Sequence, residues 1–299
     1  MGRYSNLDVF QPCSAQLGEG PSWDRARQTL WWVDITGKAL FEGRLDGSPP
    51  RRLQMDQMIG AVAPTARGGL IAALRDGIYL IDPESGQARP FAIAPEHDPR
   101  EFRFNDGKVD PLGRFWAGTL AIDGRSEQSR LYRVSGDATV KAMREGVSIS
   151  NGLAWAPDGG RLYYIDSPTR TVQAFPFDLE TGTLGPGRIA ITMNESDGWP
   201  DGCCMDADGC LWIAHWGASK LTRWDPSAGR LLDTLLLPVK NVTSCAFGGR
   251  RLDQLFITTA KDTESTASEP EAGHVFRLDP GTHGVELALF ADGSASDLP

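Results

Sequence analysis

Five polar side chains, far apart in the chain, are of the types that bind a cation and a polar substrate: Glu19, Arg103, Asn105, Asn151 and Asp201. Asp201 lies in Gly-Trp-Pro-Asp-Gly, shortly before an apolar strand-like run, and Gly202 predicts a sharp turn after the carboxylate. A carboxylate at the entrance to an apolar strand is costly unless a cation or a hydrogen-bond donor meets it. We therefore expect the other four residues to converge on Asp201.

Three of these residues carry oxygen atoms that a metal ion can use: Glu19, Asn151 and Asp201. Each precedes a different copy of the repeat described below. Hard oxygen ligands that leave open positions suit Ca²⁺, Mg²⁺ or Mn²⁺ better than a thiolate-type Zn²⁺ site. Each residue also has a simpler interpretation, since Glu19 lies between two glycines and Asn151-Gly152 is a common turn pair.

Arg103 and Asn105 belong to the segment Arg-Phe-Asn-Asp-Gly-Lys-Val. In an extended chain their side chains project to the same side, because strand side chains alternate. A guanidinium and an amide are hydrogen-bond donors suited to substrate hydroxyls. The alternative is an Asn-Asp-Gly turn in which Asp106 and Gly107 serve only the backbone.

A repeat must bring these residues together. Short strand-like runs rich in aromatic and branched residues recur at intervals of roughly 40 to 48 residues, the range of four-stranded propeller blades. Most follow an Asp/Gly turn, and each is followed by a second strand-like run. We predict an all-β fold, a six-bladed β-propeller in one domain over residues 1–299, with a two-sheet sandwich as the alternative. The six runs span residues 29–35, 70–74, 114–120, 161–166, 208–214 and 251–258.

A propeller must also close its ring, because an open sheet edge invites association. Residues 7–11 form a plausible strand before the first repeat, and we predict that it pairs with the C-terminal blade. Residues 263–272 are polar, and we expect a surface loop there.

Bulk properties exclude several classes of protein. The net charge of −9 argues against nucleic acid or an anionic membrane as a partner. No apolar run approaches the roughly 20 residues of a membrane span, and residues 1–8 lack the apolar core of a signal peptide. The five cysteines show no paired spacing. We expect a cytoplasmic protein with reduced thiols.

Other chemistries find less support. Cys203, Cys204 and Cys210 could form a thiolate metal site, but small apolar fillers of strands are the favoured interpretation. His215 could line the same mouth as Asp201, although packing at a strand end is favoured. The sequence has no nucleophile elbow, P-loop or His-Glu-x-x-His motif.

Four longer motifs identify a family resemblance. They begin at Arg103 (Arg-Phe-Asn-Asp-Gly-Lys-Val-Asp), Ile149 (Ile-Ser-Asn-Gly-Leu), Pro200 (Pro-Asp-Gly) and Thr243 (Thr-Ser-Cys-Ala-Phe-Gly-Gly). Together they resemble the senescence-marker-protein, gluconolactonase and luciferin-regenerating-enzyme family, over nearly the whole chain. The resemblance implies a six-bladed propeller with one divalent metal at the channel mouth, and lactone hydrolysis.

Carried over by motif, the resemblance implies metal ligation by Glu19, Asn151 and Asp201. It implies that Arg103 and Asn105 hold substrate hydroxyls. Asp123 stands where regucalcin-like members have a glutamate. The side chain expected to contact the substrate at this position is therefore one methylene shorter.

The resulting hypothesis is a sugar lactonase in which Asp201 is the general base and Ca²⁺, or alternatively Zn²⁺, Mn²⁺, Mg²⁺ or Fe²⁺, polarises the lactone carbonyl. The partner is then a small sugar lactone, and the protein a monomer or weak homo-oligomer. Two alternatives stay open: a calcium-binding regulator of regucalcin type, and an organophosphate or aryl ester hydrolase on the same scaffold.

Overall fold

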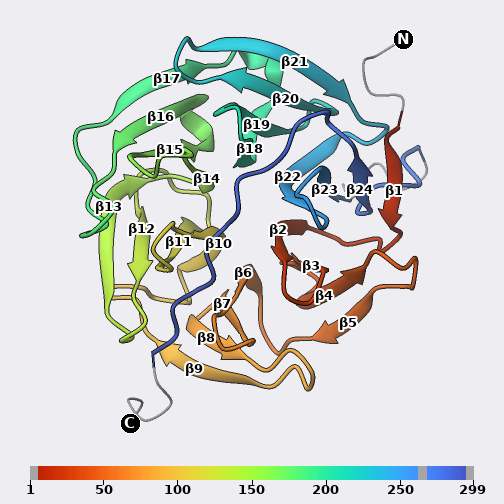
Figure 1. Cartoon of the computed structure of the whole chain (residues 1–299). Helices are drawn as coiled ribbons and strands as arrows, with labels where there is room; N and C mark the ends of the chain where they lie inside the picture. Colours follow the sequence, from red (N-terminus) through yellow and green to blue (C-terminus); the bar gives the residue numbers. More distant parts are fainter. Residues whose placement is uncertain (1–5, 262–267, 294–299) are drawn as a thin grey trace.

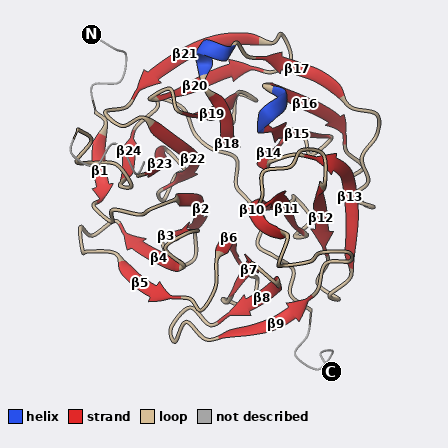
Figure 2. Ribbon diagram, turned by 180° about the vertical axis from the view of Figure 1, so that it is seen from behind, coloured by secondary structure: helices blue, strands red, loops and turns tan. Residues whose placement is uncertain are grey.

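The computed structural model describes residues 6–261 and 268–293, which form six antiparallel sheets of four strands each. The sheets stand as blades around a central channel (Figure 1). The fold is therefore the six-bladed β-propeller that the repeat predicted, and the sandwich alternative is wrong. The described helical elements are two 3₁₀ turns, η1 (Ser167–Thr169) and η2 (Glu195–Asp197), blue in Figure 2.

Each blade runs outward from an inner strand at the channel to an outer strand at the rim, so that neighbours in sequence pair in space. The strands, in blade order, are β2 (Gly18–Asp24), β3 (Thr29–Asp34), β4 (Ala39–Arg44) and β5 (Arg51–Gln54); β6 (Ile59–Pro64), β7 (Leu70–Leu74), β8 (Gly77–Ile81) and β9 (Ala88–Ala92); β10 (Phe102–Val109), β11 (Phe115–Ala121), β12 (Ser129–Val134) and β13 (Val140–Val147); β14 (Ser150–Trp155), β15 (Arg161–Asp166), β16 (Thr171–Pro176) and β17 (Arg188–Thr192); β18 (Trp199–Met205), β19 (Leu211–Trp216), β20 (Lys220–Asp225) and β21 (Arg230–Leu236); β22 (Asn241–Gly248), β23 (Gln254–Ala260), β24 (Val275–Leu278) and β1 (Asp8–Gln11).

The core lies between neighbouring blades, where apolar side chains of their facing surfaces interlock. The indole groups of Trp116 and Trp212 are fully buried there. Each indole nitrogen donates to a buried carboxylate six residues earlier, Asp110 at 2.9 Å and Asp206 at 3.0 Å. The Asp/Gly turns of the repeat therefore also satisfy the polar atom of the tryptophan that follows.

The ring closes as predicted. Strand β1 pairs with β24, and Asp8 lies opposite Arg277, with which it forms an ion pair of 2.8 Å. The predicted strand 251–258 instead begins at Gln254, because residues 249–252 form a turn closed by the bond from Leu252 N–H to Gly249 O. Part of the predicted surface loop, residues 263–267, lies outside the described residues. That one domain spans residues 1–299 stays a prediction.

After β24 the chain crosses the end of the channel, as the dark blue segment in Figure 1 shows. We call residues 283–292 the C-terminal strap. Its backbone bonds to turns of several blades, including Ala207 N–H to His283 O at 2.8 Å and Ala291 N–H to Gly113 O at 2.8 Å. These turns follow β18 and β10, so the strap covers the mouth at the C-terminal ends of the inner strands.

Candidate functional site at the open mouth of the channel

The predicted ligands and donors lie at the opposite mouth, near the N-terminal ends of the inner strands. In β10, β14 and β18 the pairing register shifts where these residues stand, and Asn105, Asn151 and Asp201 fall within the shifts. Glu19 directly precedes the corresponding shift in β2. Bulges of this kind bend a strand and redirect its side chains, and they are frequent beside active sites.

Two local expectations are corrected here. The sharp turn predicted at Gly202 is wrong, because Gly202 lies inside β18. The alternative of an Asn-Asp-Gly turn is also wrong, because residues 105–107 belong to β10. The chain accommodates the polar residues by shifting register within a strand rather than by leaving the sheet.

A chain of hydrogen bonds joins three blades at this mouth. The guanidinium of Arg103 donates to Asn105 Oδ1 at 2.8 Å, and Asn105 Nδ2 donates to Asn151 Oδ1 at 3.0 Å. Asn151 Nδ2 donates to Ser167 Oγ at 2.8 Å, and Ser167 donates to the carbonyl of Pro200 at 2.6 Å. The Asn151 amide is therefore held at both ends, and one lone pair of its oxygen stays free for a further partner.

The two carboxylates of the set are both buried, with Glu19 5% and Asp201 6% exposed. Burial, and then the charge of Asp106, raises the pKa of Glu19 to about 8. Burial raises the pKa of Asp201 well above its ordinary value, and the charges of Glu19 and Asp106 add to the effect. Carboxylates from three blades thus repel one another in a poorly hydrated place.

Arg103 partly balances this negative charge. Burial lowers the pKa of its guanidinium to about 10, while Glu19 and Asp201 act in the opposite direction. Arg103 in turn lowers the pKa of both carboxyl groups. Glu19, Arg103 and Asp201 therefore interact electrostatically although they lie on three different blades.

Glycines let the inner strands approach closely enough for these contacts. A Cβ atom added to Gly152 would lie 2.7 Å from Cys203 Sγ and 2.8 Å from the carbonyl oxygen of Asp201. A Cβ atom at Gly202 would lie 2.1 Å from Ser244 Oγ. The neighbouring strands therefore require the glycines after Asn151 and Asp201, whereas Gly20, after Glu19, has no contact closer than 3.6 Å and is favoured by its positive φ of 54°.

The donor set fits a hard divalent cation. Burying two carboxylates that repel each other is unfavourable unless a positive charge lies nearby. A bound cation would supply that positive charge. In residues 6–261 and 268–293, no three His, Cys, Asp or Glu side chains gather as a metal site. A cation beside Glu19 and Asp201 would need further oxygen ligands, and the amide oxygen of Asn151 is the predicted one.

Asp123 stands apart from the other predicted site residues. It follows β11 at the same end of the third blade, and its side chain is 61% exposed. Its carboxylate accepts the backbone N–H of Arg125 at 3.2 Å and forms an ion pair with the same residue at 3.4 Å. Its substrate contact stays a prediction.

Sequence reasoning missed the third carboxylate, Asp106. In a regular strand Asp106 would point away from Asn105, yet both side chains are buried where the register of β10 shifts. It also missed Ser167, the link between Asn151 and Pro200. A Ser-Pro pair at the start of a 3₁₀ turn carries no sequence signal for such a role.

The packing roles expected for His215 and the cysteines are confirmed. His215 is buried in β19, with ring nitrogens 2.8 Å from Asp197 O and 2.6 Å from Thr222 Oγ1. The five cysteines are free, and four of them are buried in the blades.

Among the described residues, no helix has the length and apolar character needed to span a membrane.

Comparisons with known proteins agree with this architecture. A family model described as "SMP-30/Gluconolactonase/LRE-like region" matches residues 17–261. The chain is 36% identical over 280 residues, 93% of this chain and 96% of the other, to a Bacillus subtilis protein named "Putative sugar lactone lactonase YvrE".

Two solved structures share the fold. A calcium-binding protein, regucalcin, from Agrobacterium tumefaciens superposes with a TM-score of 0.90 at 28% identity, covering 96% of this chain and 97% of that one. A gluconolactonase from Xanthomonas campestris superposes with a TM-score of 0.73 at 25% identity, covering 91% of this chain and 89% of that one.

Proposed function

The chain belongs to the SMP-30/gluconolactonase/LRE-like family, and from this premise we propose that it is a metal-dependent lactonase that opens a sugar lactone to the aldonic acid. Two observations support the proposal: the buried carboxylates of Glu19 and Asp201 interact electrostatically with the guanidinium of Arg103, and a hydrogen bond from Asn105 orients the amide of Asn151. These groups would supply oxygen ligands for a cation and hydrogen-bond donors for a polyhydroxy substrate at the same mouth of the channel.

In the proposed reaction Asp201 is the general base. It accepts a proton from the water whose oxygen attacks the lactone carbonyl carbon. Burial raises the pKa of its carboxyl group, while Arg103 favours the ionised form that acts as the base. The bond between the carbonyl carbon and the ring oxygen then breaks, and the proton goes to that oxygen, which becomes a hydroxyl group of the aldonic acid.

A divalent cation held by Glu19, Asn151 and Asp201 would polarise the lactone carbonyl and stabilise the oxyanion. Its oxygen ligands favour Ca²⁺, and the regucalcin relative is described as calcium-binding. Arg103 and Asn105 bind substrate hydroxyls and so orient the ring for attack. Asp123 binds a further hydroxyl at the rim of the mouth.

The experiment is lactone hydrolysis, followed with a pH indicator and corrected for spontaneous opening. Purified protein is treated with chelator and then given Ca²⁺, Mn²⁺, Mg²⁺, Zn²⁺ or Fe²⁺ in turn. Activity that disappears with chelator, returns with a metal and is lost in Asp201→Ala supports the proposal. Full activity in Asp201→Ala overturns the assignment of the base.

A calcium-binding regulator is the second candidate, and the description of the regucalcin relative as calcium-binding favours it. It predicts calcium-dependent binding of a protein partner without lactone turnover. Including aryl and phosphoryl esters in the substrate panel tests for another hydrolase on the same scaffold.

The free cysteines support a reducing compartment such as the cytoplasm.

A further inference from the structure

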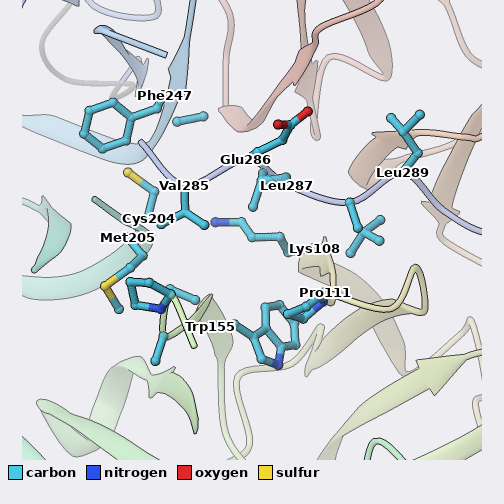
Figure 3. A pocket seen from close by; sticks show the side chains of 16 residues that line it. Lys108, Pro111, Trp155, Cys204, Met205, Phe247, Val285, Glu286, Leu287 and Leu289 are labelled. Carbon is cyan, nitrogen blue, oxygen red and sulfur yellow. The ribbon is translucent and has the colours of Figure 1, made fainter. Parts of the chain in front are cut away.

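A cavity of about 370 Å³ lies at the strap-covered mouth, at the other end of the inner strands from the candidate site. Figure 3 shows its lining. The floor comes from the ends of β10, β14, β18 and β22, and the roof is the C-terminal strap. Most of the residues that line it are apolar, including Val109, Trp155, Met205, Phe247, Val285 and Leu287, although the exposed wall also has a substantial polar part.

The roof of this cavity is fixed in place. Phe290 N–H donates to Pro64 O at 2.9 Å, and Gly284 N–H donates to Leu252 O at 2.8 Å. Phe290 itself is fully buried against the second and third blades. At the rim, Glu286 forms an ion pair with Arg25, so its charge is engaged outside the cavity. Hydrogen bonds to the blades therefore hold the roof of the cavity in place.

One cationic side chain enters this apolar space. Lys108 extends from β10 into the cavity, with its nitrogen directed toward Val285 and Cys204 in Figure 3. The ammonium group donates to Cys203 O at 2.6 Å. In the part of the chain that is described, no carboxylate lies within ion-pair distance of it, and Asp106 acts on it only at longer range. A lysine ammonium has three donors, so two remain for a ligand.

We propose that this cavity binds a small amphipathic carboxylate, such as a medium-chain fatty acid. Its carboxylate accepts hydrogen bonds from Lys108, and its alkyl chain packs between Trp155, Phe247 and the strap. Apolar walls with one cation suit a single charge on an apolar body.

The test is calorimetric titration of the full chain with octanoate and, separately, with octan-1-ol. The two probes share an alkyl chain and differ in charge, so their comparison isolates the contribution of Lys108. Octanoate is expected to bind roughly tenfold more tightly than the alcohol, as a charge-assisted hydrogen bond provides. Quenching of tryptophan fluorescence by a brominated fatty acid gives a second readout, because Trp155 is among the residues that line the cavity.

Three variants test whether the ligand binds in this cavity. Lys108→Met is expected to weaken octanoate roughly tenfold and leave octan-1-ol unchanged. Ala154→Leu adds volume to the cavity wall from β14, and it is expected to weaken both probes. Glu84→Gln, at an exposed position outside the cavity lining, is the matched control and is expected to change neither. Absence of octanoate binding to the wild type, or equal octanoate affinity in Lys108→Met, overturns the proposal.

Discussion

The amide nitrogen of Asn105 donates a hydrogen bond of 3.0 Å to the amide oxygen of Asn151, and so joins the third and fourth blades at the open mouth of the channel. The same nitrogen donates to Ser150 O at 2.8 Å. Asn105 therefore fixes which face of the Asn151 amide points into the mouth. In the proposed site, Asn105 therefore has two roles: it binds the substrate and it positions the metal ligand Asn151.

Asn105→Ala tests this double role. The variant loses the bonds to Asn151 and Ser150, so the Asn151 amide is free to rotate. We expect both kcat/KM for lactone hydrolysis and cation affinity to fall by about 10- to 100-fold, as for other partners that orient metal ligands. A fall in kcat/KM with unchanged cation affinity would limit Asn105 to the substrate.

Asp123→Ala tests the predicted rim contact. Because Asp123 is exposed and lies outside the hydrogen-bond chain, we expect KM to rise roughly tenfold with little change in kcat. Asp158→Ala is the matched control, since Asp158 lies in the β14–β15 turn at the opposite mouth. Wild-type KM in Asp123→Ala would remove Asp123 from the site.

Gly152→Ala tests the close approach of β14 and β18. The new methyl group meets Cys203 Sγ and the carbonyl of Asp201, so either strand must move. We expect the free energy of unfolding to fall by about 1–3 kcal/mol, as for other overpacked sites. Gly69→Ala, whose nearest contacts are 3.5 Å away, should be close to neutral in the same urea titration. Equal stability of the two variants would contradict the close approach.

His215 should make stability depend on pH. Burial, and then the charge of Lys220, lowers the pKa of the imidazole from 6.5 to about 4. The unfolded chain therefore binds a proton at higher pH than the folded one. The stabilisation is complete above pH 6.5 and is lost as the pH falls toward 4, by up to about 3 kcal/mol.

Urea unfolding at neutral and acidic pH measures this effect. His215→Gln removes the titrating group, so it should lose less stability in acid than the wild type. His283→Gln, at an exposed position, is the matched control and should keep the wild-type dependence. The same acid sensitivity in all three proteins would show that His215 does not contribute.

The blades could be predicted from sequence because each strand carries a local signal. In the run at Arg161 to Asp166, branched and aromatic residues follow an Asp-Gly turn, and the run appears unchanged as β15. The register shifts could not be predicted in this way. Whether β10 shifts at Asn105 depends on its partner β11, and no residue pattern inside β10 specifies the shift.

The strap and Asp106 were missed for a related reason. Residues 283–292 have no strand periodicity, and turns of other blades determine their path. Asp106 acquires its role from Glu19 and Asp201 on distant strands. Motif resemblance named the ligand set because it groups distant residues, whereas local patterns describe one segment at a time.

The most direct test of the account is calorimetric titration of chelator-treated protein with Ca²⁺. The wild type is expected to bind one ion, and Glu19→Gln and Asp201→Asn, which keep the side-chain shape, to bind it at least roughly tenfold more weakly. Glu84→Gln, at an exposed position, serves as the control. Unchanged Ca²⁺ affinity in both site variants would contradict a cation held between Glu19, Asn151 and Asp201.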